Sequence, residues 1–136
     1  MKKLMIEVPK EINFLVVDDL ESMRKMAIHQ LSQMGFKGNV FQASNVSEAK
    51  TVVAQEKIDF ILSDWNMPEE SGYDFLLAVR AMPKYKNTPF LMVTTVDDVG
   101  DMLNAINAGA SNYLVKPWKP EDFEEKLKYA WEKHAK

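Results

Sequence analysis

Several kinds of residue and segment are missing from the sequence, and each absence removes a class of protein. The chain of 136 residues has no cysteine, which excludes a disulfide framework, a thiolate zinc site and a cysteine nucleophile. No apolar run approaches the ~18 residues that a membrane span needs. The first residues, MKKLMIEVPK, hold too short an apolar stretch for a signal peptide. We therefore expect a cytoplasmic protein that does not associate with membranes.

The chain also lacks an excess of basic charge. The formal net charge is −3, so the positive field that nonspecific binding of nucleic acid requires is not expected. The whole chain contains 46% apolar and 27% charged residues, which is typical of a folded globular protein. The length suits one domain with a core of its own, and we expect it to be monomeric.

Short apolar runs alternate with longer segments of helical period, the pattern of β-α units that build a parallel sheet. Four of the runs are continuously apolar, as in strands that helices cover on both faces. The second run alternates apolar and polar residues, so we expect it at an edge of the sheet. The predicted strands are Phe14–Val17, Asn39–Ala43, Phe60–Leu62, Phe90–Val93 and Tyr113–Val115.

Helix signals fill the segments between the strands. Ser22 is expected to cap the first helix, and Gly35 followed by Phe36 predicts a left-handed conformation at its end. Asn45, with Glu48 three residues later, predicts the capped start of the second helix. The remaining helices are expected over residues 73–82 and 98–108 and from Pro120 onward.

Polar residues follow the apolar runs at the carboxyl ends of four predicted strands. Asp18 and Asp19 follow the first, Asp64 the third, Thr94 the fourth and Lys116 the fifth. In a doubly wound parallel sheet these ends share one edge, where ligands bind. We therefore expect residues that are distant in sequence to converge on one crevice.

The chemistry of these side chains is complementary. Three carboxylates form a hard-oxygen site, which suits Mg²⁺ or Mn²⁺ better than zinc. A divalent cation would relieve the repulsion between Asp18 and Asp19. A lysine and a threonine hydroxyl would supply a charge and a hydrogen-bond donor for phosphoryl oxygens. The two histidines, His29 and His134, have no ligand-type partner at a useful spacing and are expected at the surface.

Five segments resemble, in order, the CheY-type receiver domain of the response-regulator family. They are LVVDD, SDWNMP, LMVTT, AGASNYLVKP and EEKL. The match begins at about Ile12, so residues 1–11 are interpreted as an N-terminal extension and residues 12–136 as the receiver domain. The resemblance implies an α/β fold of the flavodoxin-like (β/α)5 type, a doubly wound five-stranded parallel sheet with strand order 2-1-3-4-5.

The resemblance also implies the roles of the site residues. Asp64 matches the phosphoacceptor, which takes a phosphoryl group from a sensor histidine kinase or a small acyl phosphate. Asp18, Asp19 and Asp64, with the backbone carbonyl of Asn66, match the ligands of Mg²⁺, for which Mn²⁺ can substitute. Lys116 matches the lysine that pairs with the phosphoryl oxygens.

Thr94 and Tyr113 match the switch pair of the family, and Pro117 is expected to follow a cis bond. Phosphorylation would bias a protein-binding surface made by the fourth helix, the fifth strand and the fifth helix. The implied protein is a signalling protein rather than an enzyme, although it promotes its own phosphorylation and dephosphorylation. We expect a role in chemotaxis or motility, with a downstream target, for which the flagellar motor switch is one candidate, and a phosphatase as partners.

Two other functions are weighed against this one. A receiver-like interaction module, or a phosphorelay intermediate outside chemotaxis, is left open by the sequence. A magnesium-dependent aspartyl-phosphate phosphatase is disfavoured, because such enzymes separate their two aspartates by one residue, whereas Asp18 and Asp19 are adjacent. No P-loop is present.

The sequence departs from the family pattern at a few positions. Thr95 stands where a small residue is usual, which predicts altered access for the phosphodonor. The apolar Val96 is predicted to change the lifetime of the aspartyl phosphate. The acidic segment VDDVGD, residues 96–101, disfavours binding to the flagellar motor. Trp118 replaces a phenylalanine and is expected to widen the apolar part of the output face.

Overall fold

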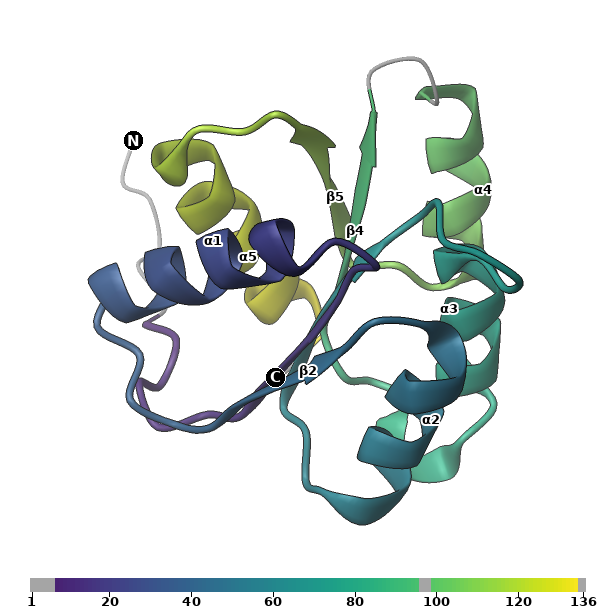
Figure 1. The fold of residues 1–136 in the computed structure, drawn as a ribbon, viewed down its shortest axis with the longest axis horizontal. Helices are drawn as coiled ribbons and strands as arrows, with labels where there is room; N and C mark the ends of the chain where they lie inside the picture. The colour runs from purple at the N-terminus through teal and green to yellow at the C-terminus, as the bar shows by residue number, and fades with distance from the viewer. Residues whose placement is uncertain (1–6, 96–98, 135–136) are drawn as a thin grey trace.

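The computed structural model describes residues 7–95 and 99–134, which form a five-stranded parallel sheet with helices on both faces (Figure 1). The strand order is β2-β1-β3-β4-β5, so the predicted fold class and strand order are confirmed. The second strand lies at an edge as expected, and β5 forms the other edge. The strands are β1 (Phe14–Val17), β2 (Val40–Ala43), β3 (Phe60–Asp64), β4 (Phe90–Thr95) and β5 (Asn112–Lys116).

The helices divide between the two faces of the sheet. They are α1 (Glu21–Gln33), α2 (Val46–Gln55), α3 (Gly72–Arg80), α4 (Val99–Ala108) and α5 (Pro120–His134), with a short 3-10 helix η1 (Pro83–Tyr85). Successive strand residues point to opposite faces: Phe14 and Val16 pack under α1 and α5, whereas Leu15 and Val17 pack under α2, α3 and α4. This double cover explains why the inner strands are continuously apolar.

The start of α1 differs from the prediction. Its N-cap is Leu20, no side chain caps the helix, and Ser22 lies inside the first turn. The prediction that Ser22 caps α1 is therefore wrong. The carboxylate of Asp18 accepts a hydrogen bond from the backbone N–H of Leu20 (3.0 Å), so the chain turns directly after β1 and the helix begins earlier.

Other helix ends follow their sequence signals. Gly35 has a φ of 96°, and the N–H groups of Gly35 and Phe36 donate to carbonyls in the last turn of α1, as in a left-handed cap. The side chain of Asn45 accepts a hydrogen bond from the backbone N–H of Glu48 (2.8 Å). Pro120 is the first residue of α5. These predictions are confirmed.

Part of the segment before residue 12 packs on the sheet's α1 and α5 side. Val8 is buried in the same cluster as Leu127 and Ala130 of α5, and the ammonium of Lys10 donates to the carbonyl of Met34 (3.0 Å). The division between extension and domain at residue 12 stays a prediction.

Some predictions concern residues that the structure does not describe. Residues 1–6, 96–98 and 135–136 lie outside the described ranges, and with them the prediction for Val96 and the first half of the VDDVGD segment. Within the described ranges, every helix is too short or too polar to cross a bilayer.

Candidate metal and phosphoryl site

Four strand ends bring the predicted site residues to one edge of the sheet. Asp18 directly follows β1, Asp64 is the last residue of β3, Thr94 lies near the end of β4, and Lys116 ends β5. Because these strands are adjacent and parallel, their carboxyl ends lie side by side. The predicted convergence is therefore present in the fold.

Three aspartates form an acidic cluster at this edge. One carboxylate oxygen from each of Asp18, Asp19 and Asp64 lies within 4.8 Å of the others. Asp18 and Asp64 are only 5% and 6% exposed, whereas Asp19 is exposed to solvent. Oxygen donors that are partly buried, with one side open to solvent, fit the preference of Mg²⁺ for carboxylates and retained water.

Lys116 lies against the two buried carboxylates. Its Nζ atom is 3.2 Å from Oδ2 of Asp18 and 3.2 Å from Oδ2 of Asp64. The lysine side chain is 19% exposed, so these contacts are screened by water less than a surface ion pair. The ammonium offsets part of the repulsion between the carboxylates and lies within reach of any group attached to Asp64.

The pKa of Asp64 is raised from its ordinary value of 3.8 to about 6. Burial is the largest cause, and the charge of Asp18 is the second; the ammonium of Lys116 and a hydrogen bond from the backbone N–H of Trp65 oppose them. At pH 7 the carboxylate is still mostly ionised, which is the form that acts as a nucleophile.

Thr94 and Tyr113 lie on the same face of the sheet. Tyr113 packs against the cluster that contains Met92, and strand alternation places Thr94 on the same side of β4 as Met92. Thr94 is 1% exposed, and Tyr113 is half-buried with the ammonium of Lys126 5.0 Å from its ring centroid. The two residues therefore lie on one face of the sheet, and their role as a switch pair stays a prediction.

Other site residues lie in or beside the loops at this edge. Asn66 is exposed in the loop that follows β3, and Thr95 is exposed at the end of β4. The ring of Trp65 packs 5.5 Å from that of Tyr73. The peptide bond before Pro117 is cis, as the resemblance implies. The predicted roles of Asn66 and Thr95 stay predictions.

Gly72 supports the site through a close contact with the end of β3 that the sequence did not reveal. A Cβ atom added there would lie 2.1 Å from the backbone carbonyl oxygen of Asp64, which is far too close for any side chain. The backbone N–H of Gly72 donates to the carbonyl of Trp65 (2.7 Å). Gly72 therefore lets α3 begin in direct contact with the end of β3.

Arg24 also supports the site, through contacts that the sequence did not indicate. Its guanidinium donates to the backbone carbonyl of Asp18 (2.7 Å) and to the side chain of Gln42 (3.0 Å). A cation from α1 thus fixes the backbone at the first aspartate of the cluster. No sequence signal separates Arg24 from the other charged residues of the helix.

Of two expectations outside the site, the one for Trp118 stays a prediction and the one for His134 is wrong. The indole of Trp118 donates to Gln30 of α1 (2.7 Å) and packs on Phe123, within the cluster under α1 and α5. Its effect on the output surface formed by α4, β5 and α5 stays a prediction. His134 is half-buried and shares a hydrogen bond with Ser111, because the end of α5 packs beside the start of β5.

Comparisons with known proteins agree with the fold. The family model for the response regulator receiver domain matches residues 14–128. A chemotaxis protein CheY homolog from Campylobacter jejuni is 37% identical over 117 residues, which are 85% of this chain and 89% of that protein. The chemotaxis protein CheY1 from Helicobacter pylori is also 37% identical over 117 residues, covering 85% and 94% of the two chains.

A solved structure gives the same result. The chemotaxis protein CheY4 of Vibrio cholerae is 36% identical, has a TM-score of 0.81, and is matched over 88% of this chain and 98% of its own. Fold, sequence similarity and family model thus point to one assignment. The chain belongs to the response regulator receiver domain family and is a receiver domain of the CheY type.

Proposed function

We propose that this response regulator receives a phosphoryl group on Asp64 from a sensor histidine kinase and passes the signal to a target protein in the cytoplasm. The proposal rests on the position of Asp64, which lies in one cluster with Asp18 and Asp19 and 3.2 Å from the ammonium of Lys116. The relatives at 37% identity are chemotaxis proteins, which supports a role in chemotaxis or motility. We further propose that the protein acts as a monomer.

Asp18, Asp19 and Asp64, with the backbone carbonyl of Asn66, would hold Mg²⁺ or Mn²⁺. When bound, the ion supplies positive charge that favours the ionised carboxylates and offsets the charge on phosphoryl oxygens. Asp18 and Asp64 are held in place by Lys116 and by their strand ends, so the ligand atoms are already close together.

The transfer step uses the carboxylate of Asp64 as the nucleophile. One of its oxygens attacks the phosphorus of a phosphohistidine, the P–N bond breaks, and the imidazole nitrogen leaves with the bonding electron pair. The product is an aspartyl phosphate. Lys116 stays paired with the oxygens of the transferred group, and later attack by water at phosphorus restores the carboxylate and releases phosphate.

The signal then reaches the output surface through Thr94 and Tyr113. The hydroxyl of Thr94 moves toward the phosphoryl group, and the ring of Tyr113 turns inward behind it. This motion changes the surface formed by α4, β5 and α5, which a target protein binds. The flagellar motor switch is one candidate target, and a phosphatase would end the signal.

The phosphoacceptor is tested by phosphorylation with a small acyl phosphate. In the presence of Mg²⁺ the protein should gain one phosphoryl group that hydroxylamine removes, as expected for an acyl phosphate. Asp64→Asn should abolish the gain. Asp59→Asn changes an aspartate just before β3, at the opposite end of the strand from Asp64, and should keep it. A phosphoryl group on the Asp64→Asn protein would contradict the assignment.

The pathway is tested by the rate of transfer from different kinases. Among the purified histidine kinases of the source organism, we expect the chemotaxis kinase to transfer fastest. Fastest transfer from a different kinase would favour a phosphorelay outside chemotaxis. Target binding that is equal for wild type and Asp64→Asn, with and without phosphodonor, would favour the alternative of an interaction module.

A further inference from the structure

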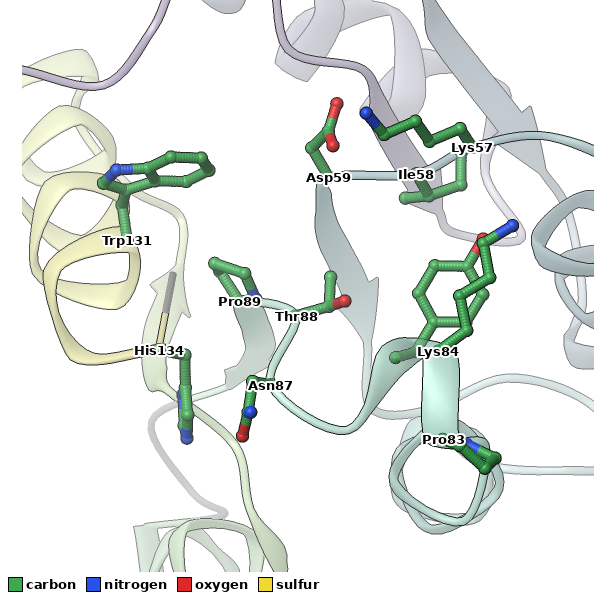
Figure 2. Close-up of a pocket in the computed structure, with 11 residues that line it drawn as sticks. Lys57, Ile58, Asp59, Pro83, Lys84, Asn87, Thr88, Pro89, Trp131 and His134 are labelled. Carbon is green, nitrogen blue, oxygen red and sulfur yellow. The ribbon is translucent and has the colours of Figure 1, made fainter. Parts of the chain in front are cut away.

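A groove of about 390 Å³ opens at the amino ends of β3 and β4, opposite the strand ends that carry the acidic cluster (Figure 2). Pro89, just before β4, lies at its centre. Lys57, just before β3, and Lys84 of η1 line one side, and Trp131 and His134 from the last turns of α5 line the other. Segments that are far apart in sequence thus build one concave site.

The groove carries positive charge in an acidic protein. Lys57 and Lys84 are both exposed, and neither forms a salt bridge within residues 7–95 and 99–134; the ammonium of Lys84 lies over the ring of Tyr85. Asp59 is the one carboxylate among the described residues that line the groove, and its Oδ2 atom already accepts the backbone N–H of Asn13 (2.8 Å). An anion would therefore meet two cations and one carboxylate that is already hydrogen-bonded.

His134 adds a polar group but little charge. Burial, followed by the cations of Arg80 and Lys133, lowers the pKa of its imidazole below the ordinary value of 6.5. The ring is therefore neutral near pH 7, and its Nδ1 atom is engaged with Ser111. The positive charge of the groove comes from the lysines.

The groove also has a flat apolar wall and polar side chains that can still form hydrogen bonds with a ligand. The indole of Trp131 extends from α5 toward the space above Pro89 (Figure 2), and it is only half-buried. The side chains of Asn87 and Thr88 line the groove and form no hydrogen bond with any residue of the described ranges. Apolar walls with a few converging polar groups are typical of small-molecule sites.

We propose that this groove binds a small anion that carries a flat ring, with the ring against Trp131 and a phosphate or carboxylate group facing Lys57 and Lys84. The volume lies within the range of about 300–1,000 Å³ for such sites. Aromatic contact and charge pairing would act on different ends of the same ligand. The site is separate from the phosphoryl site because it lies at the opposite ends of the strands.

The test is a titration of the ¹⁵N-labelled protein without divalent cations, followed through the indole N–H signal of Trp131, which Trp131→Phe identifies. Adenosine monophosphate and benzoate serve as ring-bearing probes with a phosphate and a carboxylate, respectively. Adenosine and inorganic phosphate supply the ring alone and the anion alone. We expect a saturable shift with at least one ring-bearing anion, and binding at least about tenfold weaker for either part alone.

Matched lysine variants show whether the charge acts as proposed. Lys57→Gln with Lys84→Gln should weaken binding at least about fivefold, whereas Lys37→Gln, an exposed lysine outside the groove, should leave it unchanged. Preference for one probe identifies phosphate or carboxylate as the preferred group. No saturable shift with either ring-bearing anion up to about 10 mM, equal binding of adenosine, or equal binding by the double variant would overturn the proposal.

Discussion

Asp64 is subject to two opposing electrostatic demands. It must be ionised to attack phosphorus, yet burial and Asp18 raise its pKa to about 6. Lys116 keeps the charged form accessible, because its ammonium contacts Asp64 and Asp18 equally, at 3.2 Å. Lys116 therefore favours the ionised, reactive form of Asp64, and it also reduces the repulsion between two buried carboxylates.

A stability difference follows from the raised pKa of Asp64. The folded state binds the Asp64 proton more tightly than the unfolded state, so this group lowers the stability of the metal-free protein as the pH rises from about 4 to about 6. Asp64→Asn should remove that cost and stabilise the protein at pH 7 by on the order of 2 kcal/mol. Urea unfolding in EDTA should show a difference in the free energy of unfolding between wild type and Asp64→Asn, and this difference should grow across this pH window. A difference that is the same at pH 4 and pH 7 would contradict this origin.

Lys116 is expected to compete with metal ions for the same oxygens. In Lys116→Gln the carboxylates of Asp18 and Asp64 lose a cation that now lies 3.2 Å from each. Magnesium should therefore bind a few-fold more tightly, while phosphorylation by an acyl phosphate falls by at least about tenfold because the phosphoryl oxygens lose their partner. Titration of Trp65 fluorescence, with the other tryptophans replaced, measures the first effect. Weaker Mg²⁺ binding in the variant would contradict competition.

At the scale of the elements, the contact between β3 and α3 fixes the phosphoacceptor. Gly72 begins α3 within van der Waals reach of the Asp64 carbonyl, and a capping box between Ser71 and Asp74 fixes the helix start. The capping box holds α3 at a set position, so strain introduced at Gly72 is transmitted to the Asp64 backbone.

Gly72→Ala tests this contact. The added methyl group would lie 2.1 Å from the carbonyl oxygen of Asp64, so we expect a loss of about 2 kcal/mol in the free energy of unfolding together with slower phosphorylation. Gly100→Ala in α4 is the matched control. No described atom lies within 4 Å of its added methyl group, and alanine should stabilise that helix by up to about 1 kcal/mol. Equal effects of the two changes on unfolding would argue against the contact.

The loop between β3 and α3 stores backbone strain at Glu69. Its φ is 72°, a left-handed conformation that costs a non-glycine residue on the order of 1 kcal/mol. Glu69→Gly should therefore raise the free energy of unfolding by about 0.5 kcal/mol, because the relief of strain exceeds the added entropy of the unfolded chain. Urea unfolding compares it with Glu70→Gly, which has no left-handed φ to relieve and should be destabilising. A loss of stability in Glu69→Gly would contradict this account.

At the scale of the whole molecule, the pattern of strand ends was sufficient to predict which residues meet. The apolar runs identified the strands because both faces of the inner strands are covered, and parallel topology then placed Asp18, Asp64, Thr94 and Lys116 at one edge. Contacts set by tertiary packing were not predictable in this way. Leu20 is the N-cap of α1, and its N–H donates to the carboxylate of Asp18. The need for glycine at position 72 depends on how close α3 comes to β3.

The most direct test of the account follows backbone amide signals of the metal-free protein as Mg²⁺ and then beryllofluoride, a phosphoryl mimic, are added. The account predicts changes at the carboxyl ends of β1, β3, β4 and β5 on addition of Mg²⁺, followed by changes in α4, β5 and α5 that need both additions. The response to beryllofluoride should be lost in Asp64→Asn and kept in Asp59→Asn. Unchanged signals at the strand ends, or an equal response in the Asp64→Asn protein, would contradict the claim that these ends form one metal and phosphoryl site.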